Sequence, residues 1–243
     1  ENSTPNDGVF CSEDDVHAAA LAVVAAERGL VLADFGPRNI DRLLIFLDIA
    51  RRTGRRIVAL LKDAYLLDAM ACADPAIPTP LTESNFAVYS PVEGDNSKWK
   101  GKMRQRYGSS LVDWRELSAH PEGYIVCFSF FHIKHLADLD GVRGSYIYST
   151  SEAHNEEQAI DIRRLRNWLD HFGFQLVGDP ERGEGRFHAS GHASPRDLLH
   201  MIRTIRPKFL IPVHTQDPAF FVEHLGREMT VKVAPTGTAL ELA

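Results

Sequence analysis

The stretch GLVLADFGPRNIDRLLIFLDIARRTGRRIVALL, residues 29–61, decides the fold class. It opens with GLVLADF (29–35), a short apolar run bounded by turn residues, which is typical of a buried strand. The segment 38–54 follows, with apolar residues on one helical face and Gly54 as its stop. RRIVALL (55–61) is a second apolar run. A strand, a helix and a strand joined by short connections predict a parallel sheet, and we therefore expect an α/β fold.

The rest of the chain continues this alternation, apart from its middle. The sequence predicts strands at 123–130, 144–150, 208–214, 229–233 and 237–242, and a strand leading into FHASGHAS at 187–194. It predicts helices at 14–28, 155–173 and 195–206, and a short helix near 132–138. Prolines at 75, 78, 80 and 91 favour loops and short elements over 72–97.

The composition excludes several classes of protein. The chain has 243 residues, of which 44% are hydrophobic and 25% charged, as in ordinary globular proteins. Its net charge of −6 gives no global basic field, so any polyanion site must be local. Cys11, Cys72 and Cys127 lie far apart, which indicates a reducing, cytoplasmic setting without a disulfide framework. No apolar run is long enough for a membrane helix and no signal peptide is visible, so we expect no membrane partner.

Two segments carry the strongest chemical signal, FHASGHAS at 187–194 and KFLIPVHT at 208–215. Each is expected to follow or end a buried strand, at the sheet edge where α/β proteins place their ligand sites. Hydroxyls and free amides before a helix that starts at Pro195 predict a phosphate cradle. A histidine at a strand end can bind zinc through one ring nitrogen. The candidates are His188, Ser190, Gly191, His192, Ser194 and His214. The remaining histidines, including His132, are interpreted as structural or exposed.

A basic segment, SKWKGKMRQRYG at 97–108, is a second candidate for substrate contact. Clustered cations can follow phosphates, and aromatic side chains can stack on bases. The candidate RNA contacts are Lys98, Trp99, Lys100, Lys102, Arg104 and Arg106. A solvated helix or loop face with one buried aromatic explains the same residues equally well, and both interpretations stay open.

FHASGHAS together with IPVH resembles the closing motifs of the β-CASP branch of the metallo-β-lactamase superfamily. That branch includes RNase J and the nuclease subunit of mRNA 3′-end processing complexes. Residues 34–61 resemble the strand, Asn-x-x-Arg helix and Gly-Arg strand that open the β-CASP insert. SEDDV (12–16) resembles the acidic segment before it, and YIYSTSEAHNEEQ (146–158) resembles its end. Residues 72–122 match only loosely. The resemblance implies a remnant of the metallo-β-lactamase domain at 1–12, a β-CASP domain with a parallel sheet and flanking helices at 13–173, and the closing segment of the αββα metallo-β-lactamase fold at 174–243.

The resemblance also implies roles for individual residues. His192 would contact the scissile phosphate and protonate the leaving oxygen, oriented by Glu13, and both would be catalytic. His214 would be a metal ligand, and a histidine at this motif is typical of the members that cut RNA. The residues that would bind phosphate or substrate are His188, Ser190, Gly191 and Ser194, with Asn39 and Arg42 of the Asn-x-x-Arg helix.

One signature of the superfamily, His-x-His-x-Asp-His, does not occur in these residues. It normally supplies most ligands for two zinc ions (Zn²⁺) and lies upstream of the insert. Because the chain also begins with Glu1, we expect a piece of a longer protein whose N-terminal metallo-β-lactamase half completes the site. The isolated piece should then be inactive, since one histidine cannot hold a catalytic zinc.

Three functional hypotheses remain open. The first is a zinc-dependent ribonuclease, acting as an endonuclease or a 5′-exonuclease. The second is a hydrolase of the same fold that acts on DNA or another phosphodiester. The third is a non-catalytic partner subunit that binds RNA. The sequence does not decide the RNA target, the polarity of cleavage or the oligomeric state, and a homodimer is left open.

Overall fold

The computed structural model describes residues 11–36, 38–91, 98–139, 141–150, 156–182, 187–189, 193–213, 215, 217–235, 237 and 239–240. The chain divides into two compact units. The large unit is Cys11–Ala189, and the small unit combines Glu1–Phe10 with Ser190–Ala243. The described part of the chain has no helix that is long and apolar enough to span a bilayer.

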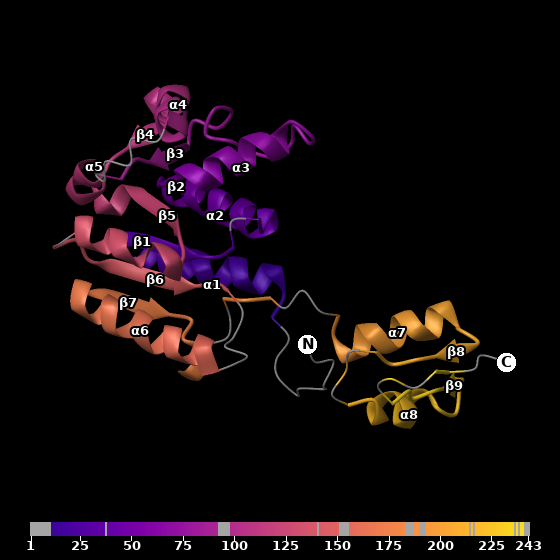
Figure 1. The fold of residues 1–243 in the computed structure, drawn as a ribbon. Coiled ribbons are helices and arrows are strands. Elements are labelled where there is room, and N and C mark those ends of the chain that lie inside the picture. The colour runs from indigo at the N-terminus through magenta and orange to yellow at the C-terminus, as the bar shows by residue number, and fades with distance from the viewer. Residues whose placement is uncertain are drawn as a thin grey trace. The chain divides into compact units, whose positions relative to one another are not determined.

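A seven-stranded sheet forms the centre of the large unit, in the order β4-β3-β2-β5-β1-β6-β7 (Figure 1). Every strand pair in it is parallel. The strands are β1 Leu30–Asp34, β2 Arg56–Leu60, β3 Phe86–Tyr89, β4 Leu111–Val112, β5 Tyr124–Phe128, β6 Gly144–Tyr148 and β7 Phe174–Val177. The sheet confirms the predicted α/β class.

Helices connect these strands and cover both faces of the sheet. The α-helices are α1 Glu13–Ala26, α2 Ile40–Thr53, α3 Leu61–Ala71, α4 Lys98–Tyr107, α5 Trp114–Ala119 and α6 Glu156–Phe172. Short 3₁₀ helices are η1 Gly108–Ser110, η2 Pro121–Gly123, η3 Phe130–Leu139 and η4 Pro180–Arg182. The short helix predicted near 132–138 is therefore a 3₁₀ helix.

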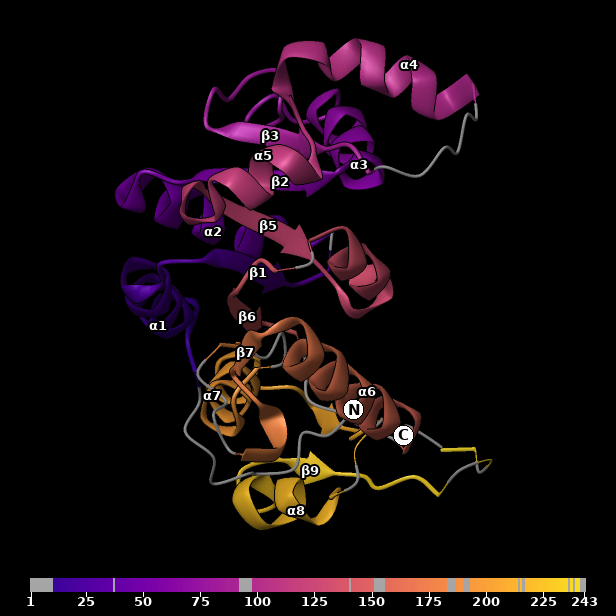
Figure 2. The ribbon, with the colours of Figure 1, turned by 90° about the vertical axis from the view of Figure 1, so that its left-hand side faces the viewer.

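Two apolar layers sandwich the sheet because each strand is covered on both sides. In β1, Val31 and Ala33 pack with α1 and α2 on one face. Leu30 and Leu32 pack with α5, η3 and α6 on the other. Figure 2 shows α1 and α2 to the left of the strands and α6 to the right. Coverage on both faces explains why the strands read as continuous apolar runs rather than alternating ones.

Helix α2 forms where the sequence predicts it, and its ends show why. The Asn39 side chain accepts a hydrogen bond from the Arg42 amide at 3.0 Å, which satisfies a free donor of the first turn. At the other end Gly54 has φ 70°, a left-handed conformation that glycine adopts without strain. The helix thus leaves the carboxyl end of β1 and returns the chain to the amino end of β2.

The sheet adds two features that the local prediction does not contain. Strands β1 and β2 are parallel, as expected, but β5 lies between them and pairs with both. Strand β3, four residues long, is a short element within 72–97, as expected there, and α3, which the sequence does not predict, follows β2 directly.

The small unit holds α7 Pro195–Ile205, β8 Phe209–Leu210, α8 Ala219–Leu225 and β9 Thr230–Val231. Strands β8 and β9 pair in parallel. Their helices pack around a core that includes Ile202, Phe220, Phe221 and Leu225. Pro195 occupies the first position of α7, as predicted. The strand predicted at 208–214 ends at Leu210, and the one predicted at 237–242 falls mostly outside the described residues.

The boundary between the units lies later in the sequence than expected. Strand β7 pairs with β6 in the large sheet, and the large unit extends to Ala189. The compact units thus divide after Ala189, whereas the expected boundary between the β-CASP domain and the C-terminal segment is 173/174, and that domain assignment stays a prediction.

Candidate functional site

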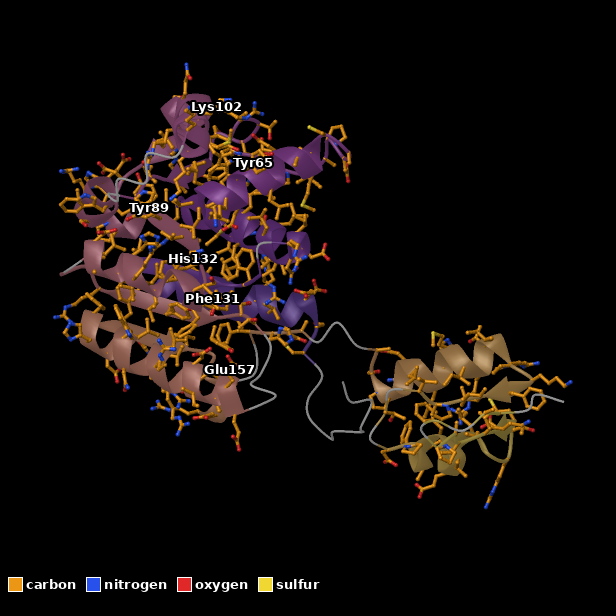
Figure 3. All side chains as sticks on the ribbon, in the orientation of Figure 1. Tyr65, Tyr89, Lys102, Phe131, His132 and Glu157 are labelled. Atoms are coloured by element: carbon orange, nitrogen blue, oxygen red, sulfur yellow. The ribbon has the colours of Figure 1, made fainter. Side chains whose placement is uncertain are left out.

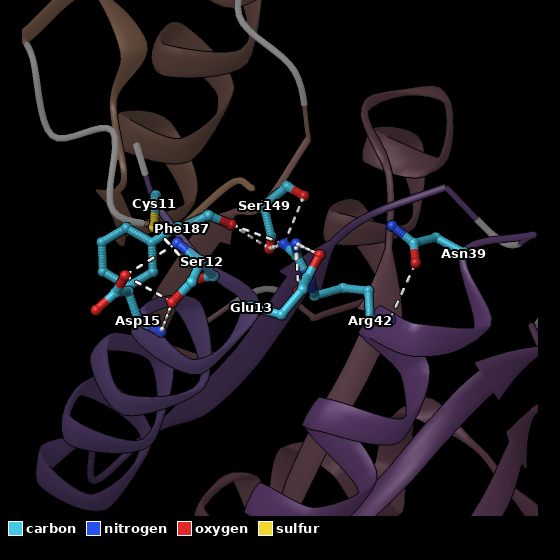
Figure 4. A network of polar contacts seen from close by, with 8 residues as sticks. All are labelled: Cys11, Ser12, Glu13, Asp15, Asn39, Arg42, Ser149 and Phe187. Atoms are coloured by element: carbon cyan, nitrogen blue, oxygen red, sulfur yellow. Dashed lines mark hydrogen bonds and ion pairs between the residues drawn. The ribbon is translucent and has the colours of Figure 1, made fainter. Parts of the chain in front are cut away.

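The guanidinium group of Arg42 lies at the centre of a buried polar network at the carboxyl edge of the sheet (Figure 4). Its side chain is 0% exposed. One terminal nitrogen, Nη1, donates to the carbonyl oxygen of Phe187 at 2.8 Å and to that of Ser149 at 3.1 Å. It also bonds the Ser149 hydroxyl. The other, Nη2, donates to both carboxylate oxygens of Glu13, each at 3.0 Å.

This network joins segments that are far apart in the sequence. Glu13 begins α1, Arg42 lies in the first turn of α2, Ser149 follows β6, and Phe187 opens the FHASGHAS segment. Ser149 is itself tied to the sheet, because its amide donates to the Asp34 carbonyl at 2.9 Å. Its hydroxyl donates to the Phe187 carbonyl at 2.5 Å. The Phe187 carbonyl therefore accepts a bond from each of two side chains.

The network changes what Glu13 and Arg42 can do. We expected Arg42 to bind phosphate, but its guanidinium is fully buried and bonded to protein oxygens. In the large unit it is thus a structural cation rather than a surface anion site. Glu13 has a side chain that is 45% exposed, and both of its oxygens bond Arg42. The catalytic role expected for Glu13 stays a prediction, because His192 lies outside the described residues.

The other predicted site residues divide into two groups. His192, Ser190, Gly191 and His214 all lie outside the described residues. His188 is half-buried and does not end a strand, since Phe187–Ala189 form no regular element. The described part of the sequence therefore does not show the predicted strand leading into this segment.

Two predicted phosphate contacts are helix caps. Ser194 caps α7: its hydroxyl accepts a bond from the Asp197 amide at 3.0 Å and donates to the Asp197 carboxylate at 2.7 Å. Asn39 caps α2 through its side-chain oxygen. Capping accounts for both residue types at these positions, and their expected phosphate-binding roles stay predictions.

The described residues contain no group of three or more His, Cys, Asp or Glu side chains that could hold a metal ion. A catalytic zinc site needs about three protein ligands and an open position. The described residues therefore do not fit a zinc site by themselves.

A small cavity opens at the carboxyl ends of β1, β2 and β5, the edge at which open α/β sheets bind ligands. Its wall is apolar, with Phe35, Leu43 and Phe128 among the lining residues, and its polar lining consists of Asp63, Ser129 and His132. His132 is labelled in Figure 3.

In this cavity the pKa values of Asp63 and His132 are shifted in the directions that favour their neutral forms. Burial raises the pKa of Asp63 to about 6. Burial, and then the nearby His135 and Lys62, lower the pKa of His132 to about 4. The His132 ring bonds the Ser129 hydroxyl at 2.8 Å. We had interpreted His132 as structural or exposed; the spacing Ser129-x-x-His132 directly after a buried strand was the signal that could have drawn attention to it.

The basic segment forms helix α4, which carries Lys102 outward on the large unit (Figure 3). Trp99, Met103 and Tyr107 pack against α3 and β3, so one face of the helix is anchored. Trp99 also meets the ring of Tyr65 edge-on, with centroids 5.6 Å apart, and Tyr65 is 49% exposed.

Its predicted RNA contacts are not equally available. Arg106 forms an ion pair with Asp68 at 2.6 Å, so its charge is already balanced within the protein. Lys98 and Lys102 are exposed, and Lys100 and Arg104 are half-buried. The lysines at 98 and 102 are thus the cations that α4 presents most openly.

A comparison with known protein families finds a match, and it covers the segment that contains His188, His192 and His214. Residues 186–234 match the family described as Zn-dependent metallo-hydrolase RNA specificity domain. The match begins at the end of the large unit and covers α7, β8, α8 and β9. No curated protein matches the chain. The family match supports the resemblance to the metallo-β-lactamase superfamily for this segment, and it associates the segment with zinc-dependent hydrolysis and with RNA.

Proposed function

We propose that this chain is part of a zinc-dependent hydrolase that cleaves phosphodiester bonds of RNA. The observation that carries the proposal is the family match over 186–234, because it spans both histidine segments, FHASGHAS and IPVH. Within this proposal the large unit is a β-CASP domain. Two observations support this assignment. The sheet is parallel, and α2 begins with Asn39 and Arg42, the two residues of the Asn-x-x-Arg motif in the β-CASP helix that it resembles.

We assign the chemistry of this chain to the histidine segments. His192 contacts the scissile phosphate and gives a proton to the leaving oxygen. The amides and hydroxyl around Ser190 and Gly191 hold the phosphate, with His188 beside them. Helix α7 begins directly after this segment, and the positive end of a helix favours a bound anion.

His214 supplies one metal ligand in this proposal, and it cannot be enough. A zinc ion that catalyses hydrolysis needs further protein ligands, so the remaining ones come from the N-terminal metallo-β-lactamase half of the intact protein.

Helix α4 provides a second contact to the RNA. Its exposed cations, Lys98 and Lys102, would follow the phosphate backbone, and the exposed Tyr65 beside Trp99 would offer a ring on which a base can stack. The overall charge of −6 makes such a local patch necessary for a polyanion.

Cleavage assays on the intact protein test this function and separate it from its alternatives. The substrates are a 5′-monophosphorylated RNA and a DNA of the same sequence, each with the native metal, after chelation, and after zinc is restored. We expect zinc-dependent cleavage of the RNA. Cleavage confined to DNA or to a small phosphodiester would favour a hydrolase with another substrate. RNA binding without cleavage in the zinc-loaded protein would favour a partner subunit.

A further inference from the structure

The chain passes between its two units at two places, after Phe10 and after Ala189. Glu13 lies just after the first crossing, in the first turn of α1. Phe187 lies just before the second. Both residues are bonded to the same side chain, that of Arg42, within the large unit. A residue beside each of the two connections is thus hydrogen-bonded to one buried guanidinium.

The attachment of Phe187 is tighter than a single hydrogen bond. Its carbonyl accepts hydrogen bonds from Arg42 and from the Ser149 hydroxyl, and the residue is 9% exposed and belongs to the core on the α2 face of the sheet. Ser149 in turn is held by the backbone of β1 through Asp34. Phe187, the first of the described residues 187–189 before the predicted catalytic histidine, is therefore hydrogen-bonded to side chains that are fixed to the sheet.

We propose that Arg42 is a positioning residue: it fixes both chain crossings to the large unit and so sets the starting point of the histidine segment 188–194. It acts through the Phe187 carbonyl and the Glu13 carboxylate and does not touch substrate. The catalytic consequence rests on the proposed function, whereas the anchoring of residues 187–189 does not.

Only arginine fits this arrangement. The planar guanidinium directs Nη1 to the carbonyls of Ser149 and Phe187 and Nη2 to the carboxylate of Glu13. A lysine ammonium is a single point charge and cannot serve both sides in a fixed fork geometry. Arg42→Lys keeps the charge and loses the fork, which separates positioning from electrostatics.

The chain offers a matched control in Arg55, a second buried arginine at the opposite edge of the sheet. It is 4% exposed and donates to the carbonyls of Gly29 at 2.9 Å, Tyr124 at 3.3 Å and Glu27 at 2.6 Å. The Gly29 and Tyr124 carbonyls lie at the amino ends of β1 and β5, and Glu27 is the C-cap residue of α1. Removing Arg55 should weaken the sheet without affecting either crossing.

Hydrogen–deuterium exchange of this chain tests the anchoring without any activity. The variants are Arg42→Lys, Ser149→Ala and Arg55→Met, compared with the parent in denaturant that equalises their global stability. Ser149→Ala removes one of the two hydrogen bonds to the Phe187 carbonyl, together with the bond between Arg42 and the Ser149 hydroxyl, and it keeps the test open if the arginine variants fold poorly. We expect exchange in peptides covering 187–194 to rise at least tenfold in Arg42→Lys and to rise less in Ser149→Ala. Peptides of β2 and β5 should stay protected in both. Unchanged exchange at 187–194 in Arg42→Lys, or an equal rise in Arg55→Met, would overturn the proposal.

Kinetic measurements on the intact protein test the catalytic consequence of the proposal. We expect Arg42→Lys to lower kcat on RNA at least tenfold with zinc content retained and KM little changed, while Arg55→Met leaves kcat near the parent value. An equal loss of kcat in Arg42→Lys and Arg55→Met would mean that Arg42 contributes to stability only and does not position the histidine segment. If the parent itself cleaves no RNA, the proposed function fails, and the exchange experiment still decides whether Arg42 anchors the segment.

Discussion

The guanidinium of Arg42 donates to both carboxylate oxygens of Glu13 at 3.0 Å, from a position with no solvent exposure. A charge buried in this way is stable only when its partners remain, so Glu13 balances a cation that has no access to water. The carboxylate that the sequence suggests as catalytic therefore has a structural function in the large unit, whatever it contributes to catalysis.

The stability of Glu13→Gln checks that structural function. The amide keeps the shape but removes the charge and one acceptor, so we expect the free energy of unfolding to fall by about 1–3 kcal/mol. Urea titration of this chain measures the change. Asp14→Asn is the control, because it removes an exposed charge from the same turn of α1. Equal effects of the two changes would mean that the helix dipole, not the Arg42 pair, accounts for the loss.

The pH dependence of stability should report Asp34. This carboxyl lies at the end of β1 and accepts a bond from the Tyr146 hydroxyl at 2.7 Å. Burial raises its pKa to about 7 from the usual 3.8, so the folded state binds the proton more tightly than the unfolded state. Its contribution is present below pH 4 and is lost as the pH rises from about 4 to about 7.

Asp34→Asn removes this titration, and at pH 7.5 we expect the variant to be more stable relative to the parent than at pH 5. Between pH 5 and pH 7.5 this shift corresponds to a difference of at most about 3 kcal/mol. Urea midpoints at both pH values measure it. Asp63→Asn serves as a comparison, because burial raises the pKa of Asp63 to about 6 and its change should have the same sign. A pH profile that Asp34→Asn leaves unaltered would contradict the assignment.

Binding of single-stranded RNA tests helix α4 apart from cleavage. We expect the double change Lys98→Ala and Lys102→Ala to weaken binding and to reduce the salt dependence, since each phosphate contact contributes a slope of about 0.7 for single strands. Tyr65→Ala should weaken binding with little change in that slope, by about 1–3 kcal/mol if a base stacks on the ring. Fluorescence anisotropy at several salt concentrations gives both quantities. Arg163→Ala on α6 is the control, because Arg163 is exposed and lies outside α4. Loss of binding in the control alone would place the RNA elsewhere.

The sequence predicts those parts of the fold that local signals determine. The unit β1-α2-β2 follows from two apolar runs, the apolar face of the helix between them and Gly54 as its stop. The short elements expected within 72–97 cannot be assigned as strand or helix, because the four residues of β3, FAVY, follow a proline-rich stretch and have no longer pattern around them. Helix α4 does have a signal: Trp99, Met103 and Tyr107 recur every four residues and pack on one side. Four basic residues in between draw attention to charge instead.

The candidate site is less predictable because its contacts are long-range. Arg42 meets Ser149 and Phe187 across more than a hundred residues of sequence, and no spacing in one sequence reveals such a pair. The insertion of β5 between β1 and β2 is hidden for the same reason. The histidine motifs are recognised as motifs, and the family match over 186–234 agrees with them. The roles of His192 and His214 stay predictions.

Zinc content and RNA cleavage, measured on the same preparations of the intact protein, test the central claim most directly. We expect His214→Ala to lose both zinc and activity, because a ligand fixes geometry and charge at the metal. We expect His192→Ala to keep its zinc while its turnover falls by about 10²–10⁴, the range that a general acid contributes. Loss of zinc in His192→Ala with zinc retained in His214→Ala would reverse the two roles. Cleavage unchanged in both variants would contradict the proposed phosphodiesterase.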